Sequence, residues 1–135
     1  MLFRLVIITP KGVYLDEQVS SLTCKLTTGY RTFLAKHAPL VGSLDYGEMH
    51  FVSSKNETEY FAIFKGAVNV TNDGITLITT NIEAAKDIDV ARAEASKARA
   101  EERLSSDSPD IDKNRAKLSL LRAMIRLKVA LFRKD

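Results

Sequence analysis

The 135-residue sequence predicts a β + α protein, in which an N-terminal flattened antiparallel β-sandwich or barrel is followed by a C-terminal two-helix antiparallel hairpin. Up to about Asn81, short runs rich in Val, Ile, Thr, Phe and Tyr alternate with Gly, Asn, Asp and Ser, as is typical of strands and turns. After Asp87, Ala, Arg, Glu and Lys dominate, and these are strong helix formers. We therefore expect a β-domain over residues 1–84 and a helical hairpin over residues 85–135.

The clearest strands expected in the first region are 2–8, 19–27, 49–53, 59–64, 67–71 and 75–79. In the second of these, Leu22, Cys24 and Leu26 alternate with polar residues, which places the apolar side chains on one buried face. The last two strands are separated by Asn-Asp-Gly at 72–74, a strong hairpin signal because Gly and Asn tolerate positive φ. Many short strands at this spacing indicate a small sandwich or barrel.

The first helix is expected to begin at Asp89, since an aspartate before a helical run is a favourable N-cap. Ala91, Ala95 and Ala98 follow at helical spacing. We expect them to form a seam of small residues that lets another helix approach closely. The Ser-Ser-Asp-Ser-Pro segment at 105–109 then ends this helix.

The second helix is expected to start with Ser108 as N-cap and Pro109 as its first residue. One apolar stripe is formed by Leu118, Leu121, Ile125, Val129 and Phe132. Another face carries a row of arginines: Arg115, Arg122, Arg126 and Arg133. The apolar stripe must be covered by another surface, which makes this helix a candidate interaction element.

Composition argues against several classes of function. Apolar runs such as 5–8 are far shorter than a membrane-spanning helix requires, and we expect no cleavable signal. Cys24 is the only cysteine, so an internal disulfide is excluded, and the sequence is compatible with a reducing compartment.

His37 and His50 have no accompanying catalytic or zinc-ligand pattern, so we expect polar structural roles for them and a core position for Cys24. The glycines are scattered singly and form no phosphate loop. We therefore expect no catalytic residues and no protein-bound metal.

The net charge of +3 conceals a basic excess in residues 113–134. The arginine row is compatible with a solvated helix face, and a basic amphipathic helix is also compatible with nucleic acid or an anionic membrane. Nucleic acid is disfavoured because the β-domain lacks an interleaved aromatic and basic surface. An acidic protein surface and a phosphate-bearing ligand both suit the planar fork of arginine. Periodicity does not choose between these two.

The complete layout resembles the epsilon subunit of bacterial F-type ATP synthases. Local marks of the resemblance are Ile-Thr-Pro-Lys-Gly at 8–12, His-Ala-Pro-Leu at 37–40, Gly66, and Glu-Ala-Ala-Lys-Asp-Ile-Asp at 83–89. The sequence departs from the family where Thr-Phe-Leu-Ala at 32–35 replaces the usual Gly-[Ile/Leu/Val]-Leu-Pro run. It departs again where Lys65-Gly66 replaces a pair of glycines. These departures concern details of the surface that meets the rotor ring more than the fold.

The resemblance also implies a nucleotide site. Residues 88–93, Ile-Asp-Val-Ala-Arg-Ala, match the Ile/Leu-Asp-x-x-Arg-Ala motif that some bacterial members use to bind ATP when the hairpin is folded down. The ATP-binding residues implied are Glu83, Ile88, Asp89, Arg92, Ala93, Arg122 and Arg126. Helix-start chemistry alone also explains Asp89 and Arg92. No cofactor is required, and ATP is expected only as a regulatory ligand.

A non-catalytic rotor subunit is the role that the resemblance implies. The β-domain is expected to dock on the gamma subunit and the c-ring, coupling ion translocation to ATP synthesis. The hairpin is expected to switch between a compact form and an extended form that inhibits ATP hydrolysis. In the extended form Arg115, Arg122, Arg126 and Arg133 would contact the beta subunit of the catalytic alpha/beta head. The expected location is the cytoplasmic face of the bacterial membrane, reached through the complex alone. The alternative is a free-standing ATP-sensing module outside any rotor.

Overall fold

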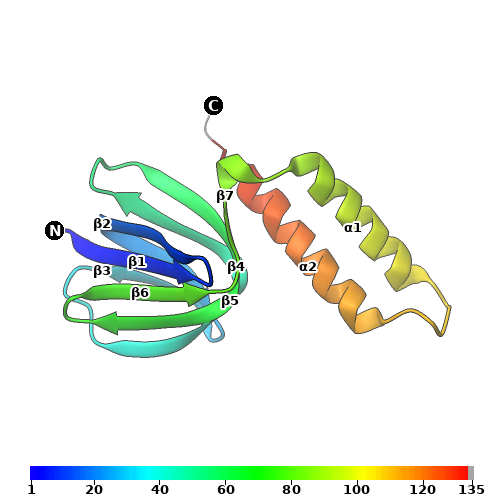
Figure 1. The fold of residues 1–135 in the computed structure, drawn as a ribbon, viewed down its shortest axis with the longest axis horizontal. Helices are drawn as coiled ribbons and strands as arrows, with labels where there is room; N and C mark the ends of the chain where they lie inside the picture. Colours follow the sequence, from blue (N-terminus) through cyan, green and yellow to red (C-terminus); the bar gives the residue numbers. More distant parts are fainter. Residues whose placement is uncertain (134–135) are drawn as a thin grey trace.

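The computed structural model describes residues 1–133, so positions 134 and 135 of the predicted helical region lie outside the described residues. A β-domain is followed by a helical hairpin (Figure 1). The strands are β1 (Phe3–Thr9), β2 (Gly12–Leu26), β3 (Gly29–Leu34), β4 (Leu40–Ser53), β5 (Thr58–Thr71), β6 (Gly74–Thr79) and β7 (Ile82–Ala84). The helical segments are η1 (Ala85–Asp87), α1 (Val90–Ser105) and α2 (Lys113–Ala130). The predicted fold class is confirmed.

The sheet closes into a ring in the order β1-β6-β5-β4-β2, because β2 also pairs with β1. β3 adds to β2, and β7 adds to β5. The β1–β6 pair is parallel, so the expectation of a wholly antiparallel sheet is wrong at this position. The reason is geometric: strand directions cannot alternate all the way around a ring with an odd number of strands.

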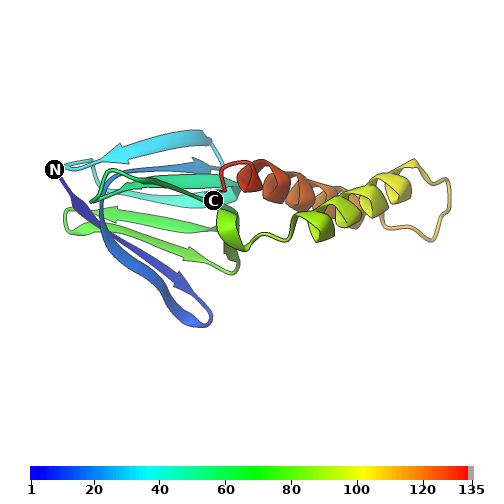
Figure 2. The same cartoon turned by 90° about the horizontal axis from the view of Figure 1, so that it is seen from above.

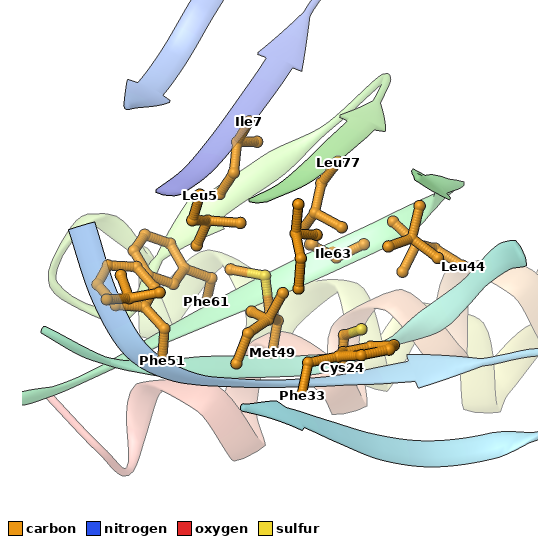
Figure 3. Close-up of a cluster of buried hydrophobic side chains, with 14 of the residues drawn as sticks. Leu5, Ile7, Cys24, Phe33, Leu44, Met49, Phe51, Phe61, Ile63 and Leu77 are labelled. Atoms are coloured by element: carbon orange, nitrogen blue, oxygen red, sulfur yellow. The ribbon is translucent and has the colours of Figure 1, made fainter. Parts of the chain in front are cut away.

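Alternating side chains from this ring fill one apolar interior (Figure 3). In β1, Phe3, Leu5 and Ile7 are buried while Arg4 is exposed, which is the period-two pattern of a strand with one face in a core. Cys24 is 1% exposed in this interior, which confirms its predicted place in the core. Burial raises the pKa of the Cys24 thiol from 9.0 to about 12, so the group stays protonated and unreactive.

Several predicted strand limits are wrong. The expected strands 59–64 and 67–71 are a single strand, β5, although Lys65 and Gly66 have φ of 74° and 158°. β2 starts at Gly12 rather than 19, β4 starts at Leu40 rather than 49, and β3 and β7 were not predicted. The missed segments contain Gly, Ser and charged residues of low strand propensity. Their backbones nevertheless pair with neighbouring strands, and this tertiary pairing overrides propensity. The hairpin predicted at 72–74 is confirmed between β5 and β6.

The first helix begins as predicted, because the Asp89 carboxylate accepts the Arg92 backbone N–H at 3.0 Å. The predicted start of the second helix is wrong. Asp112 is its N-cap and accepts the Arg115 N–H at 3.1 Å. The hydroxyl of Ser108 instead accepts the Asp110 N–H at 3.3 Å, within the turn that precedes the helix. A local side-chain hydrogen bond of this kind competes with helix formation and delays it.

The seam between α1 and α2 uses different alanines from those expected. Ala91, Ala95 and Ala98 are exposed. The alanines buried in the hairpin are Ala93, Ala100, Ala116 and Ala123, each at most 2% exposed. Ala93 and Ala100 are seven residues apart, as are Ala116 and Ala123, so each pair recurs on one side of its helix after two turns. The expected mechanism, close approach of small residues, holds on another face of α1.

The predicted apolar stripe of α2 is only partly buried. Ile125 and Val129 are 8% and 0% exposed, whereas Leu121 and Phe132 are 41% and 40% exposed. Two partners explain the difference, because α2 packs along α1 and meets the barrel only with its C-terminal half, beside β4, β5 and η1. Figures 1 and 2 show the hairpin projecting from one side of the barrel, with the end of α2 next to β7. Within residues 1–133, no helix combines the length and apolar character needed to cross a membrane.

Candidate functional site

A second apolar cluster joins the barrel to the hairpin. This junction cluster consists of Ala62, Phe64, Ala85, Ile88, Ile125 and Val129, with Tyr46, Tyr60 and Ala130 packed against it. It brings together β5, the linker before α1 and the C-terminal half of α2. The cluster is the place where the predicted site residues before α1 meet those on α2.

A signal for this cluster is present in the sequence of β5. Residues 60–64 are all apolar or aromatic, and the four from Phe61 to Phe64 are buried. Because successive strand residues point to opposite faces, such a run indicates a strand covered on both sides. One side of β5 faces the barrel interior, and the other carries Ala62 and Phe64 toward the hairpin. The prediction used this run only as a strand, and therefore missed the platform that Tyr46, Tyr60 and Phe64 make for α2.

Glu83 and Arg126 are brought into direct contact. Arg126 Nε donates to Glu83 Oε2 at 2.6 Å, with side chains 26% and 30% exposed respectively. The guanidinium carbon of Arg126 also lies 4.7 Å from the centroid of the Phe64 ring, a cation–π distance. The pairing of Phe61 with Ala84 in the β5–β7 ladder holds β7, and hence Glu83, beside this strand. Arg126 is therefore held between a carboxylate and an aromatic face.

The linker residues of the predicted site have mixed roles. Ile88 is buried in the junction cluster. Asp89 is exposed and caps α1, and Ala93 is buried in the hairpin seam. Arg92 is exposed, and its guanidinium makes no hydrogen bond or ion pair with the other residues of the 1–133 range. This arrangement leaves the Arg92 guanidinium available to an anionic ligand.

The arginine row does not act as one surface. The guanidinium carbon of Arg122 lies 5.8 Å from the Tyr46 ring centroid, on the barrel side of α2. Arg133 donates a hydrogen bond to the carbonyl oxygen of Ile88 in the linker. Arg115 is exposed near the first turn of α2, about 16 Å along the helix axis from Arg126. The structure thus places three arginines of the row at the junction and leaves Arg115 at the far end of the hairpin.

A cavity of about 280 Å³ lies beside the junction, between the start of β2, β5, η1 and Phe132. The pKa of Tyr14 in its wall is raised, first by burial and then by the charges of Asp87 and Glu59.

Among the described residues, no group of three or more His, Cys, Asp or Glu side chains is placed to hold a metal ion. The junction itself places the guanidinium groups of Arg122 and Arg126 beside apolar side chains, a combination that suits an anionic ligand with a hydrophobic part.

Both histidines have the structural roles that were expected. The Nδ1 of His37 hydrogen-bonds to the Leu34 carbonyl oxygen near the end of β3. On β4, His50 Nδ1 lies 2.7 Å from Glu48 Oε1, and the His50 side chain is 29% exposed. Each histidine thus has a hydrogen-bond partner within its own strand or adjoining turn.

Two family models together match nearly the whole chain. The ATP synthase delta/epsilon chain β-sandwich domain matches residues 2–85, and the long α-helix domain of the same chain matches residues 86–130. A protein named ATP synthase epsilon chain from Ruminococcus albus is 38% identical over 129 residues, covering 95% of this chain and 96% of that protein. Proteins of the same name from Staphylococcus saprophyticus and Staphylococcus aureus are 39% and 40% identical, covering 92% of each chain.

Solved structures with the same fold come from ATP synthases. A chain of the Euglena gracilis mitochondrial enzyme, solved as an OSCP/F1/c-ring assembly, superposes with a TM-score of 0.85, covering 96% of this chain and 81% of that one, at 18% identity. A chain from the central stalk and c-ring of the Tetrahymena thermophila mitochondrial enzyme gives a TM-score of 0.63 at 18% identity, covering 95% and 96%. At this identity the likeness is one of fold.

Proposed function

The chain belongs to the delta/epsilon chain family of ATP synthases, and on that premise we propose that it is the epsilon subunit of a bacterial F-type ATP synthase. Its role is non-catalytic: it forms part of the central stalk and couples ion translocation to ATP synthesis. The observation that carries the proposal is the match of both domains, in order, to relatives of that name over 92–95% of the chain. A relation confined to the barrel would support only a shared domain.

The barrel is the part that docks on the gamma subunit and the c-ring. In support of this assignment, Val13 and Ile78 are 65% and 53% exposed and pair with Ile8 from either side in adjacent strands, so they extend one apolar row across the barrel surface. Leu34 and Val41 are also exposed, at 59% and 80%. The helices contact the catalytic alpha and beta subunits. The subunit lies at the cytoplasmic face of the membrane, peripherally and only through the complex.

The junction is the proposed ATP site. This proposal is supported by the way α2 docks on the linker. Docking brings Arg122 and Arg126 to the cluster that contains Ile88, next to the start of α1 at Asp89–Ala93. Arginine forks suit phosphate oxygens, and the exposed Arg92 is available to contribute. Glu83 positions Arg126. ATP acts here as a regulatory ligand.

The hairpin regulates ATP hydrolysis by changing its partner. It meets the barrel through a limited cluster, so a ligand or a competing surface of modest affinity is sufficient to shift it. In the extended form, Arg115, Arg122, Arg126 and Arg133 pair with acidic residues of the beta subunit. Three of these arginines are engaged at the junction in the docked form, so the docked state withholds them from that surface.

Calorimetric titration with ATP tests the nucleotide site. We expect one-to-one binding by the full chain, lost in Arg92→Ala and in Arg126→Ala. Arg103→Ala, which removes the same charge at the far end of the hairpin, retains it. Absence of binding in the wild-type chain contradicts the site but leaves the stalk assignment intact.

Co-purification tests the stalk assignment itself. A tagged chain expressed in its own cells is expected to recover gamma, the catalytic subunits and the c-ring from solubilised membranes. Recovery of the chain alone favours the alternative, a free-standing ATP-sensing module.

A further inference from the structure

The turn that follows α2 contacts the barrel through an aromatic stack. The rings of Phe132 and Tyr60 have centroids 3.9 Å apart and planes inclined by only 7°. Phe132 N donates to the Val129 carbonyl oxygen at 3.0 Å, which continues α2 into this turn and fixes where the ring emerges. Tyr60 lies on β5, where the His50 ring is 5.1 Å from it. The stack therefore joins the end of the hairpin to the wall of the barrel.

The next residue binds a different element. The Arg133 guanidinium donates to the carbonyl oxygen of Ile88, which lies in the linker between the barrel and α1. Phe132 and Arg133 follow each other in sequence but contact two different segments. Arg133 binds Ile88, 45 residues earlier in the chain, and Phe132 stacks on Tyr60, 72 residues earlier. We call Tyr60, Phe132 and Arg133, with the Ile88 carbonyl, the C-terminal clasp.

We infer that the clasp holds the hairpin on the barrel and, by fixing Ile88 and the end of α2, positions the proposed ATP site; the second part rests on the proposed function. Tyr60 and Phe132 are positioning residues that act without touching the nucleotide. They do so because Ile88 immediately precedes Asp89, while Phe132 lies less than two helical turns beyond Arg126. Release of the clasp separates the two groups of site residues.

The geometry indicates a reversible contact. Phe132 is 40% exposed and lies beside the cavity of about 280 Å³. Its ring can therefore separate from the Tyr60 ring while the barrel core stays closed. Stacked aromatic pairs contribute a factor of about 2 to 12 in an equilibrium constant beyond their buried area. With the buried part of the Phe132 ring added, we expect loss of the stack to change the docking equilibrium about tenfold.

Hydrogen exchange of the full chain without nucleotide tests the clasp directly. In Phe132→Ala we expect the protection of amides in residues 125–131 to fall about tenfold, with β4 and β5 unchanged. Phe132→Tyr preserves the stack and is expected to retain protection. Leu131→Ala is the matched control, because the neighbouring Leu131 is 83% exposed. ATP titration of the same variants is expected to show weaker binding in Phe132→Ala alone, because the end of α2 is then no longer fixed beside Ile88.

Unaltered exchange protection in Phe132→Ala overturns the inference, and so does equal loss in Leu131→Ala. Lowered protection with an unchanged ATP Kd overturns the positioning role. If the wild-type chain binds no ATP, the nucleotide part of the proposed function fails, and the exchange comparison alone decides whether the clasp holds the hairpin.

Discussion

Arg126 Nε lies 2.6 Å from Glu83 Oε2, and this contact ties the second helix to the last strand of the barrel across 43 residues of sequence. Both side chains are partly exposed, and Arg126 also faces the Phe64 ring. The pair forms only while the hairpin is docked on the barrel, so its interaction free energy contributes to the stability of the docked state alone. It also withholds Arg126 from any other acidic partner.

The first prediction concerns the strength of this pair. A double-mutant cycle of Glu83→Gln and Arg126→Gln, read from denaturant unfolding without nucleotide, is expected to give a coupling free energy of about 1 kcal/mol. The value is modest because solvent screens the partly exposed charges, and it is expected to fall as salt increases from about 0.05 to 0.5 M. A coupling that is zero, or insensitive to salt, contradicts the ionic contact.

The second prediction separates the observed from the predicted face of α2. Ile125→Ala is expected to destabilise hairpin docking by about 2–4 kcal/mol, because it leaves a cavity in the junction cluster. Leu121→Ala belongs to the same predicted stripe but is 41% exposed, so we expect less than about 1 kcal/mol. Hydrogen exchange of α2 amides measures both. Equal effects would restore the predicted stripe as the buried face.

The third prediction uses the kink in β5. Lys65 has φ 74°, a left-handed conformation that strains a residue with a Cβ, and its carbonyl is held by the Thr79 hydroxyl at 2.6 Å. Lys65→Gly is expected to raise the free energy of unfolding by about 0.5–1 kcal/mol, after the entropy cost of glycine in the unfolded chain. Thermal denaturation at constant ionic strength measures this change.

Substitution of the neighbouring glycine, Gly66, is expected to change the free energy of unfolding in the opposite direction. A Cβ on Gly66 would lie 2.1 Å from the Ile78 carbonyl oxygen, in the backbone of β6. Gly66→Ala is therefore expected to destabilise the barrel by about 3 kcal/mol or more, because β6 must move. A neutral Gly66→Ala, or a destabilising Lys65→Gly, contradicts the strand geometry.

The fourth prediction is a pH dependence that arises from Cys24. Its folded pKa is raised from 9.0 to about 12 by burial. Between these values the unfolded thiol loses its proton while the folded one keeps it, so the unfolded state binds fewer protons. Stability is therefore expected to fall by up to about 1.4 kcal/mol per pH unit above pH 9.

Comparison with Cys24→Ala isolates this contribution from lysine and tyrosine titration. The variant is less stable at pH 7 because of lost packing, and the difference from wild type is expected to shrink between pH 9 and 10.5. Denaturant unfolding at each pH measures the difference. A gap that stays constant with pH contradicts the buried, protonated thiol.

Local chemistry was sufficient for much of the fold. The change from β-branched to Ala, Arg, Glu and Lys residues near Asp87 predicted the order of the two regions. The Asn-Asp-Gly turn and the Asp89 cap were also predicted correctly, because each depends on neighbours within four residues. Cys24 and its alternating neighbours were placed correctly for the same reason.

Tertiary contacts decided the rest. Residues 40–48 form a strand only because β5 pairs along them, and β1 lies parallel to β6 only because the ring has an odd number of strands. A helical stripe shows which residues share a face but cannot show where α1 ends and the barrel begins to cover α2. That division buried Ile125 and left Leu121 exposed.

For the candidate site, sequence by itself determined the types of residue: a capped helix start, an acidic residue before it and a row of arginines. The tertiary structure alone decided that Glu83 meets Arg126, that Arg115 stays apart, and that Phe132 stacks on Tyr60. The physical reason is that hydrogen bonds and ring stacking act over a few ångströms. Residues 43 or 72 positions apart reach that range only after the barrel has closed and α2 has docked on β5.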